Sequence, residues 1–146
     1  MEVLTKNPSE TEAVGKRLAL SLIENKKIPS FIALFGEMGV GKTAFTRGFC
    51  DALDISGVRS PTYTIVNEYR SASIPVFHFD MYRVDSEDDL ISVGYYDYIE
   101  KYGFCLCEWS ENIVEFLPED AITVTISRTT NNEEERIITV KEAIEP

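Results

Sequence analysis

No apolar run in the 146-residue sequence approaches the roughly 20 residues of a membrane-spanning helix. The first residues, which include Glu2, Lys6 and Pro8, also lack the apolar core of a secretory signal peptide. These absences argue against a membrane partner, and we expect a cytoplasmic protein. With 44% hydrophobic and 27% charged residues, the chain has the composition of a globular protein, and its length predicts one domain over residues 1–146.

Cysteine and histidine are scarce. The three cysteines, Cys50, Cys105 and Cys107, are odd in number, and two of them lie in one apolar run. This pattern predicts buried, reduced thiols rather than a disulfide. The single histidine, His78, does not complete a zinc site with them at the usual ligand spacing. We expect no metal bound by cysteine, and we interpret His78 as a strand residue whose ring nitrogens are satisfied.

Positive charge is also in short supply. The chain has 14 basic residues against 25 acidic ones, a net charge of −11, and no basic run. Proteins bind nucleic acid mainly by neutralising phosphates with Lys and Arg, so we expect no tight, independent binding of DNA or RNA. A protein partner with a basic surface fits this charge better. A negative surface that only keeps the protein in solution is the other interpretation, and charge does not separate the two.

The most informative motif follows an apolar strand at residues 31–35. Residues 36–43 spell G-E-M-G-V-G-K-T and match the phosphate-binding pattern G-x-x-x-x-G-K-[ST]. Its glycines allow successive N–H groups to turn inward around a phosphate at a helix N-terminus. Phe45, Phe49 and Leu53 then follow at helical spacing, which predicts that the next helix packs against the sheet. The order of strand, loop and helix predicts an α/β domain that binds a nucleotide.

Within this motif, Lys42 is expected to reach the β- and γ-phosphates, and the Thr43 hydroxyl is expected to bind Mg²⁺. The residues expected to contact the nucleotide here are Gly36, Glu37, Met38, Gly39, Val40, Gly41, Lys42, Thr43 and Ala44.

Periodicity and turn residues predict the remaining elements. Ser9 and Glu12 have the spacing of a capping box, with Ser9 as N-cap, and predict a helix that runs to about residue 27 and ends on Lys26 and Lys27. The other expected elements are a β-hairpin over residues 62–80 with its first strand at 62–69, a helical stretch over 86–99 interrupted at Gly94, a buried strand over 104–107, a short helix over 111–116, and a terminal antiparallel hairpin over 122–140.

Two carboxylates are placed to complete the site. Asp80 and Glu108 each end an apolar strand, and ligands in open α/β folds collect at the carboxyl ends of strands. One of these acids can hold Mg²⁺ while the other orients or deprotonates the attacking water. For either acid alone, a solvated loop carboxylate is the competing interpretation, but two of them beside a phosphate loop favour a catalytic role together with Lys42.

Several other residues allow two interpretations. Thr62 can sense the γ-phosphate as a switch threonine does, or can be a β-branched residue that begins a strand. Trp109 can stack on a base or anchor a partner, or can be a half-buried core residue. Arg83 can stabilise transferred charge, or can pair with the acids of residues 85–89.

At this point a family resemblance becomes visible. The phosphate loop, S-P-T-Y-T at residues 60–64, H-F-D-M-Y-R at residues 78–83 and E-W at residues 108–109 together resemble the bacterial TsaE family, the small ATPase of tRNA threonylcarbamoyladenosine synthesis. The similarity in order and spacing covers nearly the whole chain, and the last three segments are specific as a set. The resemblance implies a P-loop NTPase domain with a mixed, mostly parallel central sheet flanked by helices, antiparallel hairpin strands and an atypical strand order.

The resemblance also implies ATP and Mg²⁺ as cofactors, slow hydrolysis by the chain alone, and TsaD and TsaB as protein partners. These partners transfer a threonylcarbamoyl group to adenosine 37 of tRNAs that read codons beginning with A, so the chain would meet tRNA only through the complex. By position, the implied roles are magnesium ligand for Thr43 and Glu108, second acid for Asp80, switch-like threonine for Thr62, pocket or partner contact for Trp109, and adenine neighbour for Thr11. Arg128 and Arg136 are both candidates for a C-terminal contact to the nucleotide.

Three competing functions stay open beside an accessory ATPase. The main alternative is a small-molecule kinase, which needs several basic groups around two phosphoryl substrates, whereas the chain has only seven arginines. A GTPase switch would carry an N-K-x-D signature, but residues 25–28 spell N-K-K-I and precede the loop. A nucleotide-binding module without catalysis is disfavoured by Asp80 and Glu108. The sequence does not predict the strand order.

Overall fold

The structure is a computed structural model that describes residues 1–37, 39–61, 64–70 and 73–142. Its elements, in chain order, are β1 (Glu2–Thr5), α1 (Pro8–Glu24), β2 (Ser30–Phe35), α2 (Lys42–Asp51), β3 (Val66–Tyr69), β4 (Val76–Asp80), α3 (Glu87–Ser92), α4 (Tyr95–Glu100), β5 (Phe104–Glu108), the 3-10 helix η1 (Ser110–Phe116), β6 (Ile122–Arg128) and β7 (Arg136–Lys141).

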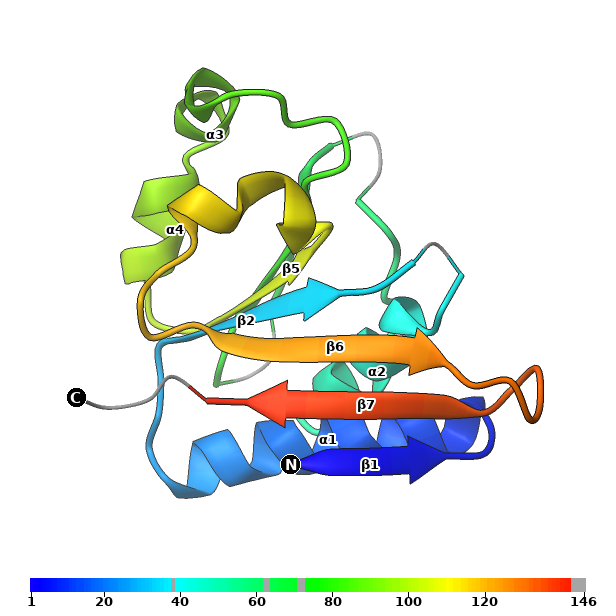
Figure 1. Ribbon diagram of the computed structural model, residues 1–146. Coiled ribbons are helices and arrows are strands. Elements are labelled where there is room, and N and C mark those ends of the chain that lie inside the picture. The colour runs from blue at the N-terminus through cyan, green and yellow to red at the C-terminus, as the bar shows by residue number, and fades with distance from the viewer. Residues whose placement is uncertain (38, 62–63, 71–72, 143–146) are drawn as a thin grey trace.

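A single sheet organises the described residues. It has seven strands in the order β1-β7-β6-β2-β5-β4-β3 (Figure 1). The four central strands β6, β2, β5 and β4 are parallel, whereas β3 at one edge and β7 with β1 at the other are antiparallel to their neighbours. The expected mixed, mostly parallel sheet with antiparallel hairpin strands is confirmed. The strand order, which the sequence did not predict, puts β2 between β6 and β5.

Each face of the sheet is covered by a different set of helices (Figure 1). Ile32 and Leu34 of β2 join a core with α1 and α2. Phe31 and Ala33, which alternate with them, join a second core with α3, α4 and η1. This two-sided burial explains why β2, β4 and β5 are apolar almost throughout, because a strand covered on both faces has no solvent side to mark with polar residues.

The contact between α1 and α2 depends on a glycine. A Cβ atom at Gly48 of α2 would lie 1.9 Å from the carbonyl oxygen of Glu12 in α1, which is far inside van der Waals contact. The two helix backbones therefore touch at this point, and α1 fixes the position of the helix that follows the phosphate loop.

The start and end of α1 differ from the sequence prediction. Its N-cap is Asn7, not Ser9, because the Asn7 Oδ1 accepts a hydrogen bond from the N–H of Glu10 at 2.9 Å and Pro8 suits the first helical position. The helix ends at Glu24, and Lys26 already has a left-handed φ of 56°. The predicted lysine-rich last turn is therefore wrong, since both lysines lie beyond the helix.

Two strands also depart from expectation. The short edge strand β1 was not predicted, because its four residues carry too brief a pattern to be separated from a loop. The first strand of the predicted hairpin is shorter than expected and begins at Val66, because Ile65 has a left-handed φ of 69° and its N–H donates to the Pro61 carbonyl at 2.9 Å. Residue 62, where the strand was expected to begin, lies outside the described residues. The hairpin of β3 with β4, the break at Gly94 and the terminal hairpin are confirmed.

Candidate functional site

The phosphate loop connects β2 to α2 at the carboxyl edge of the parallel strands (Figure 1). Gly36, Gly39 and Gly41 have φ values of 148°, 75° and 115°, which favour glycine over other residues. Gly36 also passes close to β6, because a Cβ atom there would lie 2.6 Å from the Ile126 carbonyl oxygen. Gly41 is the N-cap of α2 and supplies no side chain to the first-turn N–H groups, so these groups are available to an anion.

Lys42, at the first position of α2, is buried and only 5% exposed. Its Nζ donates to the Gly36 carbonyl at 2.8 Å and lies 4.3 Å from the centroid of the Trp109 ring. The ammonium group is thus held by a carbonyl dipole and an aromatic face. Thr43, the next residue, is exposed, and Ala44 is half-buried.

Three charged side chains hold the backbone of the loop. Arg128, at the end of β6, donates from Nη2 to the Gly39 carbonyl at 3.1 Å, and its Nη1 lies 3.5 Å from a carboxylate oxygen of Glu37. Arg136, at the start of β7, donates from Nε to the Val40 carbonyl at 2.7 Å. Both candidate arginines therefore contact the loop, and the structure does not select one of them.

The third charged side chain is Glu111 of η1, whose Oε2 accepts a hydrogen bond from the Gly36 N–H at 3.0 Å. Sequence reasoning missed this residue, because it lies 75 positions from Gly36 along the chain and in a helix with no motif of its own. Its position two residues after Trp109 is the one signal that pointed toward the site.

A cavity of about 440 Å³ lies beside the loop. It is lined by Gly39, Gly41, Lys42, Thr43, Ser60, Asp80, Tyr82, Glu108 and Trp109. The structure thus brings together five of the predicted side chains, which are those of Lys42, Thr43, Asp80, Glu108 and Trp109. Three separate loops after parallel strands contribute to one space.

The two predicted acids end neighbouring strands and face each other in register. Asp80 is 7% exposed, and its Oδ1 accepts a hydrogen bond from the Tyr82 N–H at 2.9 Å while its Oδ2 accepts one from the Ser60 hydroxyl at 3.4 Å. Glu108 is 6% exposed, and its Oε2 lies 2.6 Å from His78 Nε2. The expectation that both acids sit at strand ends beside the loop is confirmed as a matter of placement.

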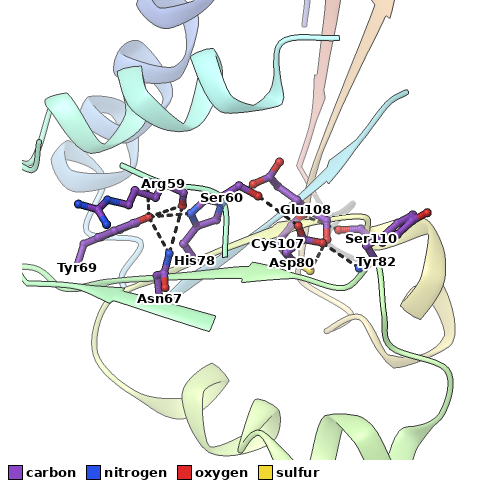
Figure 2. Close-up of polar contacts among 10 residues, drawn as sticks. All are labelled: Arg59, Ser60, Asn67, Tyr69, His78, Asp80, Tyr82, Cys107, Glu108 and Ser110. Carbon is purple, nitrogen blue, oxygen red and sulfur yellow. Dashed lines mark hydrogen bonds and ion pairs between the residues drawn. The ribbon is translucent and has the colours of Figure 1, made fainter. Parts of the chain in front are cut away.

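His78 is a fully buried residue of β4 with partners at both ring nitrogens (Figure 2). Its Nε2 contacts Glu108, and its Nδ1 lies 3.1 Å from the Tyr69 hydroxyl. The prediction of a strand histidine with satisfied polar atoms is confirmed. The contact of His78 with Glu108, an acid of the site, was not predicted.

Trp109 has a left-handed φ of 57° and is half-buried. Its ring lies 5.0 Å from that of Tyr82, which is itself 53% exposed. The Trp109 ring therefore lines the cavity over Lys42 and also packs, partly buried, against the second core, so both interpretations describe part of its surroundings.

The remaining predicted positions lie beside the site or outside the described residues. Thr11 is buried, bonds to the Thr5 hydroxyl at 2.9 Å, and would lie 3.8 Å from a Cβ atom at Gly41, so it supports the loop from behind and does not line the cavity. Met38 and Thr62 lie outside the described residues.

A hydroxyl and a carboxylate on the cavity wall are the side chains that could hold a cation bound together with a nucleotide. No group of three or more His, Cys, Asp or Glu side chains suited to a metal ion occurs in the part of the chain that the structure describes. Mg²⁺ bound with a nucleotide needs fewer protein ligands, because phosphate oxygens and water complete its shell. Thr43 and Glu108, on the wall of the same cavity, are residues able to hold it.

The cysteines take no part in this donor set. All three thiols are buried and free. Burial raises the pKa of Cys50 and that of Cys105 to about 12, so both stay protonated near neutral pH. Across the described ranges, no helix is both long enough and apolar enough to span a bilayer.

A P-loop between a central parallel strand and a helix, with two acids at the neighbouring strand ends, defines the class of P-loop proteins. Within that class, residues 5–138 match the family described as "Threonylcarbamoyl adenosine biosynthesis protein TsaE". The chain belongs to this family, and it is therefore a protein of tRNA threonylcarbamoyladenosine biosynthesis.

Individual relatives agree with this assignment. The TsaE protein of Bacillus subtilis is 38% identical over 132 residues, which cover 90% of this chain and 80% of the relative. The TsaE protein of Haemophilus influenzae is 41% identical over 116 residues, or 77% of this chain and 72% of the relative. The crystal structure of YdiB from Bacillus subtilis superposes with a TM-score of 0.78 at 33% identity and covers 98% of this chain and 85% of that one.

Proposed function

We propose that this chain binds ATP with Mg²⁺ and hydrolyses ATP as an accessory subunit of the machinery that threonylcarbamoylates adenosine 37 in tRNAs reading codons that begin with A. TsaD and TsaB are its proposed partners. The observation that carries the proposal is the single cavity of about 440 Å³ in which the phosphate loop, Asp80, Glu108 and Trp109 meet.

The proposed division of work follows from these positions. The free N–H groups at the start of α2 and the Lys42 ammonium bind the phosphates, because both present positive charge to one wall of the cavity. Thr43 and Glu108 hold the cation, which when bound neutralises charge on the phosphate oxygens. Asp80 orients or deprotonates the attacking water. Its two oxygens are held by Tyr82 and Ser60, which limits rotation of the carboxylate.

A slow intrinsic reaction is expected from the arginines. Arg128 and Arg136 both bond to the loop backbone, and neither lines the cavity with the acids. P-loop enzymes that lack a cationic group on the transferred phosphate rely on a partner for it. The net charge of −11 agrees with partners that carry the tRNA, because the chain itself repels a polyanion.

The test is ATP hydrolysis by the purified protein, alone and with TsaB, TsaD and unmodified tRNA. We expect phosphate release that rises when the partners are added and disappears in Lys42→Ala. The alternative is a small-molecule kinase, which would give no stimulation by these partners and would pass the γ-phosphate to a metabolite instead of water. Comparing the affinities for ATP and GTP tests the switch alternative in the same preparation.

A further inference from the structure

We propose that His78 is a positioning residue for Glu108, and that the Tyr69 hydroxyl connects this pair to the main chain at Arg59. The inference deepens the proposed function and rests on it, because the orientation of Glu108 matters to the reaction only if the cavity binds ATP and Mg²⁺. His78, Tyr69 and Arg59 lie outside the cavity lining, and Figure 2 shows the contacts that connect them to Glu108.

The first link is the contact between His78 and Glu108. The 2.6 Å distance from Nε2 to Oε2 requires a hydrogen atom between them, since two acceptors do not approach so closely without one. His78 is fully buried in β4, where the strand fixes its backbone between β3 and β5. One oxygen of Glu108 is therefore held from the protein interior, as metal-binding carboxylates commonly are.

The second link is the Tyr69 hydroxyl, which meets four groups at once. It donates to the Arg59 carbonyl at 2.8 Å, accepts from the Arg59 N–H at 3.0 Å and from Asn67 Nδ2 at 3.5 Å, and lies 3.1 Å from His78 Nδ1. A hydroxyl has a single proton to give. The proton of Tyr69 therefore serves either the Arg59 carbonyl or His78 Nδ1, so the position of Arg59 bears on how the histidine ring is held.

The third link joins the same segment to the other acid. Ser60 follows Arg59 directly, and its hydroxyl donates to Asp80 Oδ2 at 3.4 Å. Residues 59–60 thus contact Asp80 directly and Glu108 through Tyr69 and His78 (Figure 2). A shift of this segment is transmitted to both carboxylates, which ties the geometry of the site to a surface loop.

A purely structural role for this network predicts a different outcome. Buried polar networks also stabilise folds, and loss of His78 would then lower stability without altering how the cavity treats its cation. A positioning role instead changes the metal dependence of ATP binding and of turnover, while binding of ATP without metal stays the same because the loop and Lys42 are intact.

Three substitutions test the first two links. His78→Asn keeps an amide near Nδ1 for Tyr69 but withdraws the donor from Glu108, whereas His78→Gln places an amide near the position of Nε2. Tyr69→Phe removes only a hydroxyl from a half-buried ring. The matched control is Tyr96→Phe in α4, where the lost hydroxyl donates to Glu87 at 2.7 Å outside the cavity lining.

The measurements are kcat and KM for ATP with the partners present, Mn²⁺ affinity of the ATP complex by electron paramagnetic resonance, and ATP affinity in EDTA by calorimetry. Outer-sphere partners of metal ligands change affinity or activity by about 10–100-fold when lost. We expect that loss in kcat and Mn²⁺ affinity for His78→Asn, a smaller loss for His78→Gln and Tyr69→Phe, and wild-type ATP affinity in EDTA for all three.

The outcomes separate this inference from the function on which it rests. Wild-type values of kcat and Mn²⁺ affinity in His78→Asn and Tyr69→Phe, in a protein that hydrolyses ATP, would overturn the positioning role and leave the proposed function intact. A wild-type protein that binds no ATP with Mg²⁺ would overturn both. If His78→Asn does not fold, His78→Gln and Tyr69→Phe decide by the same criteria.

Discussion

At the scale of single residues, the clearest prediction concerns Lys42. Its charge is buried, with one carbonyl and one aromatic ring as partners. These partners leave the ammonium free to exchange the Gly36 carbonyl for a phosphate oxygen, which is the stronger acceptor. The buried side chain of Lys42 therefore stays in place while its ammonium group can change its hydrogen-bond partner.

Lys42→Ala is expected to weaken ATP binding about 10- to 100-fold, because a hydrogen bond to a charged group contributes about 1.5–3 kcal/mol. Calorimetric titration with ATP measures the change. Lys16→Ala is the control, since Lys16 is a surface lysine paired with Asp51 at 3.0 Å, and its loss should leave ATP affinity unchanged. Equal affinity in Lys42→Ala and the wild type would show that the loop does not bind phosphate through this lysine.

Glu108 carries a second prediction at this scale. Glu108→Ala removes a proposed magnesium ligand, and we expect a loss of at least about 100-fold in Mg²⁺-dependent turnover, because loss of an outer-sphere partner of a metal ligand already costs about 10–100-fold. Stopped or continuous phosphate assays of the assembled complex measure it. Glu115→Ala, on the exposed side of η1, should keep wild-type turnover. Unchanged turnover in Glu108→Ala would remove this acid from the mechanism.

At the scale of elements, the contact of α1 with α2 makes a sharp prediction about Gly48. Gly48→Ala places a methyl group 1.9 Å from the Glu12 carbonyl oxygen, so the two helices must separate. We expect the free energy of unfolding to fall by at least about 3 kcal/mol, the upper part of the usual range for overpacking. Urea unfolding followed by circular dichroism measures the change.

A second glycine provides the control for Gly48. Gly57 has a φ of 76°, but a Cβ atom added there would meet nothing within 4 Å, so Gly57→Ala should cost only about 1–2 kcal/mol for the left-handed backbone. A loss for Gly48→Ala no larger than that for Gly57→Ala would mean that the helix contact is loose in solution.

Elements with long or strongly marked patterns were predictable, and short or crowded ones were not. The apolar strand before the loop and the stripe of Phe45 and Phe49 gave β2 and α2 correctly, because burial imposes a regular spacing. The N-cap of α1 was placed two residues late, since Asn7 and Ser9 both suit an N-cap and Pro8 decides between them only through its fit to the first turn.

The features of the site also divide into some that the sequence predicts and some that it does not. Asp80 and Glu108 were predictable, because parallel strands bring their carboxyl ends to one edge whatever their order. The contacts of Arg128 with Gly39, of Arg136 with Val40 and of Glu111 with Gly36 were not, since they join residues 89, 96 and 75 positions apart. Such contacts depend on which strands become neighbours, and a single sequence carries no direct signal of strand order.

At the scale of the whole molecule, the buried thiols predict how stability changes in alkali. The pKa of Cys50 and that of Cys105 are raised by burial from the ordinary value of 9.0 to about 12, and burial shifts the pKa of Cys107 and of Tyr95 in the same direction. Below pH 9 these groups are protonated in both the folded and the unfolded chain, and their full contribution to the free energy of unfolding is present. Between pH 9 and 12 only the unfolded chain loses the protons, so stability falls.

In that window, the free energy of unfolding falls by up to about 1.4 kcal/mol per pH unit for each thiol whose pKa is raised in the folded chain. Urea unfolding of the wild type and of a Cys50→Ala, Cys105→Ala double variant at pH 7, 9, 10 and 11 gives the comparison. We expect a shallower fall above pH 9 in the double variant, whatever its stability at pH 7. Parallel curves for the two proteins would show that the thiols reach solvent in the native state.

The position of β2 inside the sheet also determines when the phosphate loop can be completed during synthesis of the chain. Ile32 pairs with Leu106 on one side and with Ile122 on the other. The Val40 carbonyl accepts its hydrogen bond from Arg136, which lies 96 residues further along the chain. During synthesis the phosphate loop leaves the ribosome long before any of these neighbours exists, and such distant pairings form late. The ATP that we propose as ligand would therefore find no finished loop in a nascent chain, and we expect it to stabilise only molecules whose last strands have already been made.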